Sequence, residues 1–151
     1  SNILWCANGV NEVKDDRILR TAPSAHNQQE IDLYVFSSEG VFQYMPNNHS
    51  LSLVVKGDFR NQIGKKEFVS LAPYVICVVA NYNKMSKYKA LGLWKRYRFS
   101  RIDAGYVSQN IYLSCVAEQL HTCACGLIHW RKIARILKLH NAYPLLLHPI
   151  G

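Results

Sequence analysis

Acidic side chains are scarce in the second half of this 151-residue chain, where Asp103 and Glu118 are the only carboxylates after Glu67. Residues 68–151 therefore carry a formal charge of +9, whereas residues 1–67 carry −1. A charge distributed in this way attracts anions, which include nucleic acid, acidic proteins and the phosphates of a cofactor. A hydrolase that works with two carboxylates would have to recruit from the first half of the chain.

Several signatures of large protein classes are also missing. The chain has no G-x-G-x-x-G, P-loop, H-E-x-x-H or G-x-S-x-G pattern, which removes the usual signals for dinucleotide, nucleotide, zinc-protease and serine-hydrolase sites. No apolar run approaches the roughly 18–20 residues of a membrane span, and no signal peptide opens the chain, so we expect no membrane partner. The five cysteines are odd in number, which favours free thiols in a reducing, cytoplasmic setting over a disulfide framework.

Hydropathy patterns predict a mixture of strands and helices. Residues 3–7 are typical of the last turns of a helix, with Asn8-Gly9 as its cap. Residues 31–36 and 41–44 alternate around a turn, which predicts a β-hairpin. We further expect a loop with a short helix at 49–66, a strand covered on both faces at 74–80, a helix of about six turns from Phe99 to Leu120, a strand at 123–128, a short helix at 130–137 and a last strand at 145–148.

Two clusters of residues allow more than one interpretation. His121, Cys123, Cys125 and His129 are zinc-ligand types, yet their spacing is equally that of a buried strand with thiols on one face. Basic and aromatic residues alternate between Tyr82 and Arg101. This is typical of single-strand nucleic-acid binding, but also of a solvated loop with aromatic anchors. No nucleic-acid motif accompanies it, and we expect no nucleic-acid partner.

Residues 20–29, R-T-A-P-S-A-H-N-Q-Q, are dense in hydrogen-bonding groups and lead directly into a predicted strand. Pro23 restricts the backbone, Ser24 and Asn27 can donate and accept, and the planar fork of Arg20 can hold a phosphate or a flavin-type carbonyl. The segment is either a binding loop or an ordinary polar loop before a strand.

Three segments together resemble the nitroreductase family of flavin enzymes, in particular its short SagB-like dehydrogenase branch. Residues 4–11 and 20–31 are similar to the family's L-W-A-x-N-G-x-N and R-T-A-P-S-A-x-N-x-Q-E-I stretches. Residues 102–110 resemble its D-x-G-x-x-x-Q-N helix, and residues 144–151 its last core strand, which ends in P-x-G. The resemblance covers nearly the whole chain in the family's order.

The resemblance implies an α+β fold, with an antiparallel-rich central sheet flanked by helices, and an interwoven homodimer with FMN at the subunit interface. It implies an FMN-dependent oxidoreductase that passes hydride from NAD(P)H through flavin to a small organic acceptor, with no catalytic side chain. The P-S-x-x-N loop of one subunit would line the flavin held by the other. The implied cofactor-binding residues are Arg20, Pro23, Ser24, Ala25, Asn27, Lys66, Cys125 and Gly126.

Parts of the family's phosphate grip are not in this chain, namely an R-R-S-x-R motif before residue 1 and a basic residue after the last glycine. We therefore expect residues 1–151 to form a single nitroreductase-like domain that is a fragment, without the N-terminal helix and the C-terminal tail. The alternative function is a flavin-less, nitroreductase-like binding protein or an inactive truncated homologue.

Overall fold

A five-stranded antiparallel sheet forms the centre of the computed structural model, which describes residues 2–15, 17–85 and 92–151. The strand order is β5-β4-β3-β6-β7, so the last strand of the chain lies at one edge. The five strands are β3 (Ile31–Phe36), β4 (Gly40–Met45), β5 (Ser50–Lys56), β6 (Tyr74–Asn81) and β7 (Ala142–Ile150).

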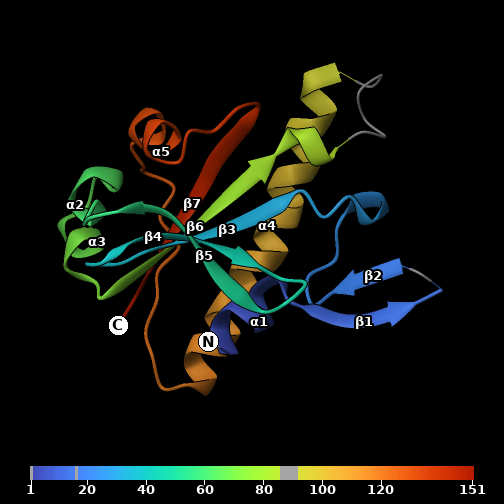
Figure 1. The fold of residues 1–151 in the computed structure, drawn as a ribbon, viewed down its shortest axis with the longest axis horizontal. Helices are drawn as coiled ribbons and strands as arrows, with labels where there is room; N and C mark the ends of the chain where they lie inside the picture. The colour runs from blue at the N-terminus through green and yellow to red at the C-terminus, as the bar shows by residue number, and fades with distance from the viewer. Residues whose placement is uncertain (1, 16, 86–91) are drawn as a thin grey trace.

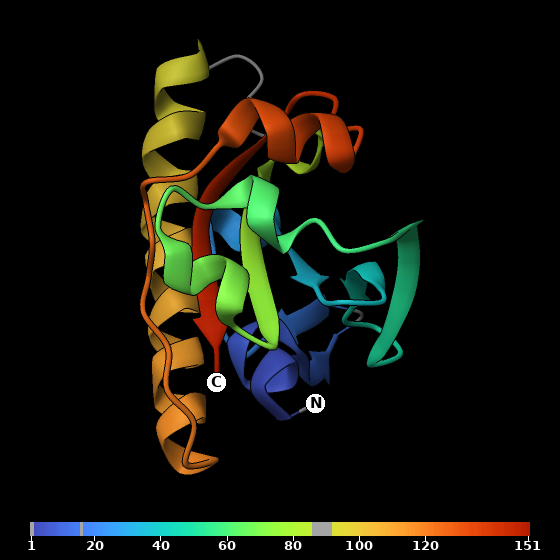
Figure 2. The same cartoon turned by 90° about the vertical axis from the view of Figure 1, so that its left-hand side faces the viewer.

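Helices cover both faces of this sheet (Figures 1 and 2). The long helix α4 (Gly92–Ala117) and the short α1 (Asn2–Asn8) lie on one face, and α2 (Arg60–Ile63), α3 (Glu67–Leu71) and α5 (Trp130–Ile136) lie on the other. Single 3-10 turns, η1 (Ala25–Asn27) and η2 (Tyr82–Lys84), precede β3 and follow β6. None of the helices in the described ranges is long and apolar enough to cross a membrane.

Strand β6 explains why the sheet is buried on both sides. Successive side chains of a strand point to opposite faces. Ile76 and Val78 therefore enter the core beneath α1 and α4, while Cys77 and Val79 enter the core beneath α2, α3 and α5. The apolar run at 74–80 thus predicted its environment correctly, and the α+β fold with an antiparallel sheet between helices is confirmed.

Other predicted elements are confirmed with shifted boundaries. The hairpin at 31–44, the N-terminal helix and the short helix after residue 129 are all present. Helix α4 begins at Gly92 rather than at Phe99, because the basic and aromatic residues before Phe99 form its first turns. The last strand runs from Ala142 to Ile150 and pairs with β6 along its length, except at Leu145, where the register shifts.

The prediction of a loop with a short helix at 49–66 is wrong in its first half, where β5 pairs with β4. The hydropathy pattern did not predict β5, because Leu51, Leu53 and Val54 are exposed at a sheet edge and the strand has no buried face. A second hairpin, formed by β1 (Val10–Lys14) and β2 (Arg17–Arg20), was also not predicted. It is largely exposed and therefore has little hydrophobic periodicity.

The predicted strand at 123–128 is wrong as well: the described residues of this segment form only isolated bridges, of Thr122 with Ile150, Cys125 with Leu147 and Ile128 with Gly64. Pro149 interrupts the pairing between the first two bridges, because it has no N–H to donate to the segment opposite. The backbone N–H of Ala124 donates instead to the hydroxyl of Tyr112, at 2.8 Å.

Candidate functional site

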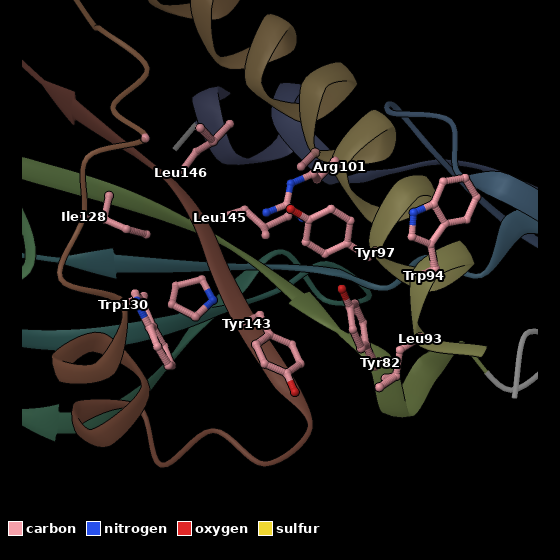
Figure 3. A pocket seen from close by; sticks show the side chains of 13 residues that line it. Tyr82, Leu93, Trp94, Tyr97, Arg101, Ile128, Trp130, Tyr143, Leu145 and Leu146 are labelled. Carbon is pink, nitrogen blue, oxygen red and sulfur yellow. The ribbon is translucent and has the colours of Figure 1, made fainter.

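A cavity of about 960 Å³ opens between α4, β7 and the segment that leads into α5 (Figure 3). Its wall is mostly apolar, and this size and lining are typical of sites for drug-sized ligands or cofactors. The wall has contributions from distant parts of the chain: η2, the first turns of α4, residues 126–130 and the middle of β7. Its aromatic side chains are Tyr82, Trp94, Tyr97, Trp130 and Tyr143.

Arg101 is the only charged residue of this wall within the described ranges. Its guanidinium carbon lies 3.3 Å from the centre of the Tyr97 ring, one turn earlier on α4. This stacking holds the cation over an aromatic face while leaving its N–H groups able to donate. The cavity therefore combines flat apolar surfaces with one positive charge.

Gly126 lies in the wall of the cavity, and a Cβ atom built on it would meet no atom within 4 Å. The space in front of this glycine is therefore free for a ligand to approach the main chain. The preceding residue, Cys125, is anchored by two backbone hydrogen bonds to Leu147, of 2.8 and 3.0 Å. Burial raises the pKa of the Cys125 thiol, and nearby Cys123 adds to that rise, while the positive charge of Lys66 opposes it. Lys66 thus lies near Cys125, although it does not line the cavity.

The loop around Ser24 contacts α4 directly. The backbone N–H of Ala25 donates to Oδ2 of Asp103 at 2.9 Å, and the next residue of the helix, Ala104, lines the cavity. Ser24 Oγ accepts from the backbone N–H of Gln29 at 2.9 Å, while Pro23 is exposed. The structure therefore places the predicted binding loop beside the helix that forms one wall of the cavity.

The backbone of this loop is strained. His26, Asn27 and Gln29 have φ values of 53°, 52° and 52°, in the left-handed region that side chains with a Cβ rarely adopt. Asn27 Nδ2 donates to the carbonyl oxygen of Ile18 at 3.0 Å, and Gln29 Nε2 donates to Asn27 Oδ1 at 2.8 Å. These bonds hold the loop against β2. Strain of this kind concentrates at ligand-binding sites.

Arg20 lies apart from the cavity. Its Nε donates to Gln29 Oε1 at 2.8 Å and its Nη1 to the backbone oxygen of Asn8 at 3.2 Å. Burial lowers the pKa of Arg20, and the negative charge of Asp32 opposes that effect. Arg20 lines a separate cavity of about 290 Å³ together with Asp32 and Lys84. In the described protomer, Gly126 is the one predicted site residue in the wall of the large cavity.

The structure bears on the two clusters that the sequence left open, the His and Cys residues at 121–129 and the basic and aromatic run at 82–101. Cys123 is exposed while Cys125 is buried, and no three His, Cys, Asp or Glu side chains of the described ranges gather as metal ligands would. In the basic and aromatic run, Arg98 lies over Trp94, with 5.6 Å from the guanidinium carbon to the ring centre. Residues 86–91 of that run, which include Lys87 and Lys89, lie outside the described residues.

The sequence did not predict that these aromatic residues line one cavity. Trp94, Tyr97 and Arg101 do follow helical spacing, which places them on one face of α4. Tyr82, Trp130 and Tyr143, however, belong to three other segments. No local pattern reports that these segments meet.

Comparisons with known proteins match the whole chain. The model of the nitroreductase family matches residues 1–151. A curated protein of Methanocaldococcus jannaschii, named as a nitroreductase, is 32% identical over 162 residues, covering 100% of this chain and 78% of that protein. The crystal structure of a protein named as a nitroreductase, from Ralstonia eutropha JMP134, is 32% identical with a TM-score of 0.88, covering 99% of this chain and 70% of that chain.

A more distant likeness concerns the fold alone. The structure titled as an NAD(P)H:FMN oxidoreductase from Staphylococcus epidermidis is 15% identical with a TM-score of 0.66, covering 99% of this chain and 84% of that chain. The family model matches the whole chain, and two relatives are 32% identical to it, one of them a solved structure of the same fold. The chain therefore belongs to the nitroreductase family.

Proposed function

We propose that this chain binds FMN and acts as an oxidoreductase that passes hydride from NAD(P)H to a small organic acceptor. Membership of the nitroreductase family supports flavin-dependent oxidoreduction. A structure of the same fold is titled as an NAD(P)H:FMN oxidoreductase. The observation that carries the proposal is the open space in front of Gly126, in the wall of a cavity of about 960 Å³.

The residues of the cavity fit a flat, conjugated ring system. Aromatic and aliphatic side chains supply planar apolar walls, and the free main chain at Gly126 supplies a polar edge. We propose that the Cys125–Gly126 turn faces the edge of the flavin ring and that its two bonds to Leu147 hold it in position. FMN, when bound, supplies the two-electron chemistry, while the protein supplies orientation and electrostatics.

Cations near the cavity have a distinct role in this proposal. Arg101 lines the wall, and Lys66 lies close enough to Cys125 to affect its thiol. Positive charge near the ring favours the reduced, more negative cofactor and attracts the phosphates of NAD(P)H. We propose Arg101 as the residue that orients the anionic part of the nucleotide or of the acceptor.

We further propose a homodimer, in which Ser24, Ala25 and Asn27 of one subunit line the FMN held by the other. Helix α4 supports this because it exposes large apolar side chains along its length. An exposed apolar face of this kind is typical of a protein interface. The residues concerned, which share one side of the helix by their spacing, are Ile102, Tyr106, Leu113 and Val116.

The dimer is tested by light scattering after size-exclusion chromatography. We expect the mass of two chains for the wild type and a shift towards one chain for Leu113→Asp, because a charge on this surface would lose hydration on association. A wild-type protein that elutes as a monomer at all concentrations would contradict the dimer.

The cofactor is tested by titrating the purified protein with FMN and following the quenching of flavin fluorescence. Side chains of increasing size at residue 126 separate a loss of space for FMN in the cavity from a loss of folding stability. Gly126→Ala and Gly126→Val place atoms in open space, so we expect unchanged thermal stability but FMN affinity that falls about tenfold or more with the larger side chain. A folded, dimeric wild type that does not bind FMN would favour the flavin-less alternative.

A further inference from the structure

Glu30 is the most anomalous polar side chain of the described structure. It is completely buried, with an exposed fraction of 0%, directly before strand β3. Neither of its carboxylate oxygens has a hydrogen-bond partner among the described residues. A buried carboxylate without donors is costly, so an ionised Glu30 would destabilise the fold.

Asp103 on α4 is the acidic residue whose charge acts on Glu30. Asp103 is also buried, at 3% exposure, and its Oδ2 already accepts the backbone N–H of Ala25 at 2.9 Å. The two carboxyl groups are close enough for each to shift the pKa of the other, although no hydrogen bond between them is present among the described residues. Two carboxylates cannot donate to one another, so a bond between them requires one proton.

The titration tendencies of both groups agree with a shared proton. Burial raises the pKa of Glu30 to about 8; Asp103 adds to the rise, while the backbone N–H of Glu30 itself and Lys84 oppose it. Burial also raises the pKa of Asp103, while the Ala25 N–H and Glu30 oppose that rise. These directions favour a proton on Glu30, which could then donate to Asp103, while Asp103 accepts from Ala25.

The remaining charges nearby are already engaged. Lys84 is the cation that acts on Glu30, and its Nζ forms an ion pair with Oδ1 of Asp32. Asp32 Oδ2 also accepts from Asn81 Nδ2 at 3.0 Å, and the charge of Asp32 acts on Arg20 as well. Lys84 is therefore already paired with Asp32 and offsets the charge of an ionised Glu30 only in part.

We propose that Glu30 and Asp103 share one proton and act as a positioning pair that holds the Ser24–Asn27 loop on helix α4. The pair sets the place of the loop because Asp103 joins it to the helix through Ala25. Loss of the proton leaves two negative charges close together in the core, and their repulsion weakens the contact between Asp103 and the loop. The strained backbone at His26 and Asn27 would relax if the loop moved away from the helix. The effect on FMN rests on the proposed function, whereas the pair itself does not.

The test uses Glu30→Gln in the full chain, because the glutamine amide donates to Asp103 as protonated Glu30 does but cannot ionise. In the wild type, the folded state keeps a proton that the unfolded chain loses near pH 4.3, so stability falls as the pH rises from about 4.3 to about 8 and levels off above that. Over this window the unfolding equilibrium constant grows by up to about tenfold per pH unit for one proton. We expect that dependence to be absent in Glu30→Gln and retained in Glu12→Gln, an exposed control.

Asp103→Asn serves as a second variant should Glu30→Gln fail to fold. Its Oδ1 can accept from Ala25 while its Nδ2 donates to Glu30, so the loop stays in place without a shared proton. Infrared spectroscopy gives an independent readout. We expect a protonated-carboxyl band at pH 7 in the wild type that is lost in Glu30→Gln and shifted in Asp103→Asn, because the hydrogen-bond partner of Glu30 changes from a carboxylate to an amide. Hydrogen exchange at the Ala25 amide, corrected for its intrinsic rate, should accelerate above pH 8 in the wild type alone.

The outcomes separate this pair from the proposed function. Equal pH profiles for the wild type and Glu30→Gln, or a wild type without a protonated-carboxyl band at pH 7, would overturn the pair whether or not FMN binds. If FMN does bind, its affinity should fall above pH 8 in the wild type and stay level in Glu30→Gln. If FMN does not bind, the proposed function fails, while the infrared and exchange results still decide the pair.

Discussion

Ser108 Oγ and His148 Nε2 lie 2.9 Å apart in the core, where helix α4 crosses strand β7. His148 has an exposed fraction of 0%, and its other ring nitrogen lies 3.3 Å from Thr122 Oγ1. The ring also meets Tyr112 edge-on, with 5.6 Å between centres. The imidazole of His148 thus connects helix α4, strand β7 and the segment after α4 that leads to the cavity.

This histidine predicts a loss of stability in acid. Burial lowers the pKa of His148 to about 4. Between about pH 6.5 and 4 the unfolded chain binds a proton that the folded chain does not, so stability falls as the pH falls, by up to ~3 kcal/mol. The measurement is urea unfolding at several pH values. The Glu30 group acts in the opposite direction, so the relevant quantity is the difference between variants.

A matched pair isolates the histidine. We expect His148→Gln to be less stable at pH 7 but to lose the acid dependence relative to the wild type. His140→Gln, at an exposed position, should keep that dependence. If the free energy of unfolding depended on pH in the same way for the wild type and His148→Gln, protonation of the buried imidazole would not destabilise the fold, which would contradict this prediction.

A side chain at Gly9 is predicted to clash with Trp5 and to destabilise the protein. A Cβ atom at Gly9 would lie 2.4 Å from Trp5 Cδ1 and 2.6 Å from the Trp5 carbonyl oxygen. The Gly9 N–H donates to that same oxygen at 2.7 Å, which holds the chain in place as α1 ends. We expect Gly9→Ala to destabilise the protein by ~1–3 kcal/mol in thermal or urea unfolding.

Gly105 provides the control for this substitution. A Cβ atom there would meet nothing within 4 Å, and the residue lies inside α4. Gly105→Ala should therefore leave stability unchanged or raise it by up to ~1 kcal/mol, because alanine favours a helix. Equal effects of the two substitutions would contradict the close contact with Trp5.

Two isoleucines on α4 should differ strongly in their contribution to folding. Ile111 is fully buried against the sheet, whereas Ile102 is 45% exposed. Ile111→Ala removes buried methyl groups and leaves a cavity, so we expect a loss of about 2–5 kcal/mol in urea unfolding. Ile102→Ala should cost about 1 kcal/mol or less for the protomer. A reversed order would mean that α4 faces the sheet differently.

The cysteines should react with an alkylating reagent in order of accessibility. Cys123 is exposed, while Cys77 is fully buried in β6 and its burial strongly raises the pKa of its thiol. Because the thiolate is the reactive form, we expect Cys123 to be modified first and Cys77 only on unfolding. Mass spectrometry of the digested protein measures both rates. Modification of Cys77 at the rate of Cys123 under native conditions would be inconsistent with the buried strand.

Much of the fold could be predicted because burial leaves a periodic trace. The apolar run at 74–80 predicted a central strand. The apolar residues at helical spacing between Phe99 and Leu120 predicted the long helix, but Ile102, Tyr106, Leu113 and Val116 among them are exposed, and Val107, Ile111 and Cys115 face the sheet instead. The exposed elements could not be found in this way. Strand β5 and the β1–β2 hairpin have little or no buried face, so their pairing comes from backbone hydrogen bonds that any sequence can make.

The candidate site was only partly predictable for a related reason. Motif similarity pointed to Gly126 and to the loop around Ala25, yet it could not tell that Ala25 binds Asp103 across a separation of 78 residues. The aromatic wall and the buried Glu30–Asp103 contact depend on which segments meet in space.

The apolar positions, the loop rich in hydrogen-bonding groups and the similarity to a family can all be found in the sequence. The burial of Glu30 without a hydrogen-bond partner, and the meeting of aromatic rings from four segments in one cavity wall, follow from the folding of distant segments against one another. A local pattern shows only whether each residue favours water or the core. The field that a titratable group experiences depends instead on every segment that folds against it.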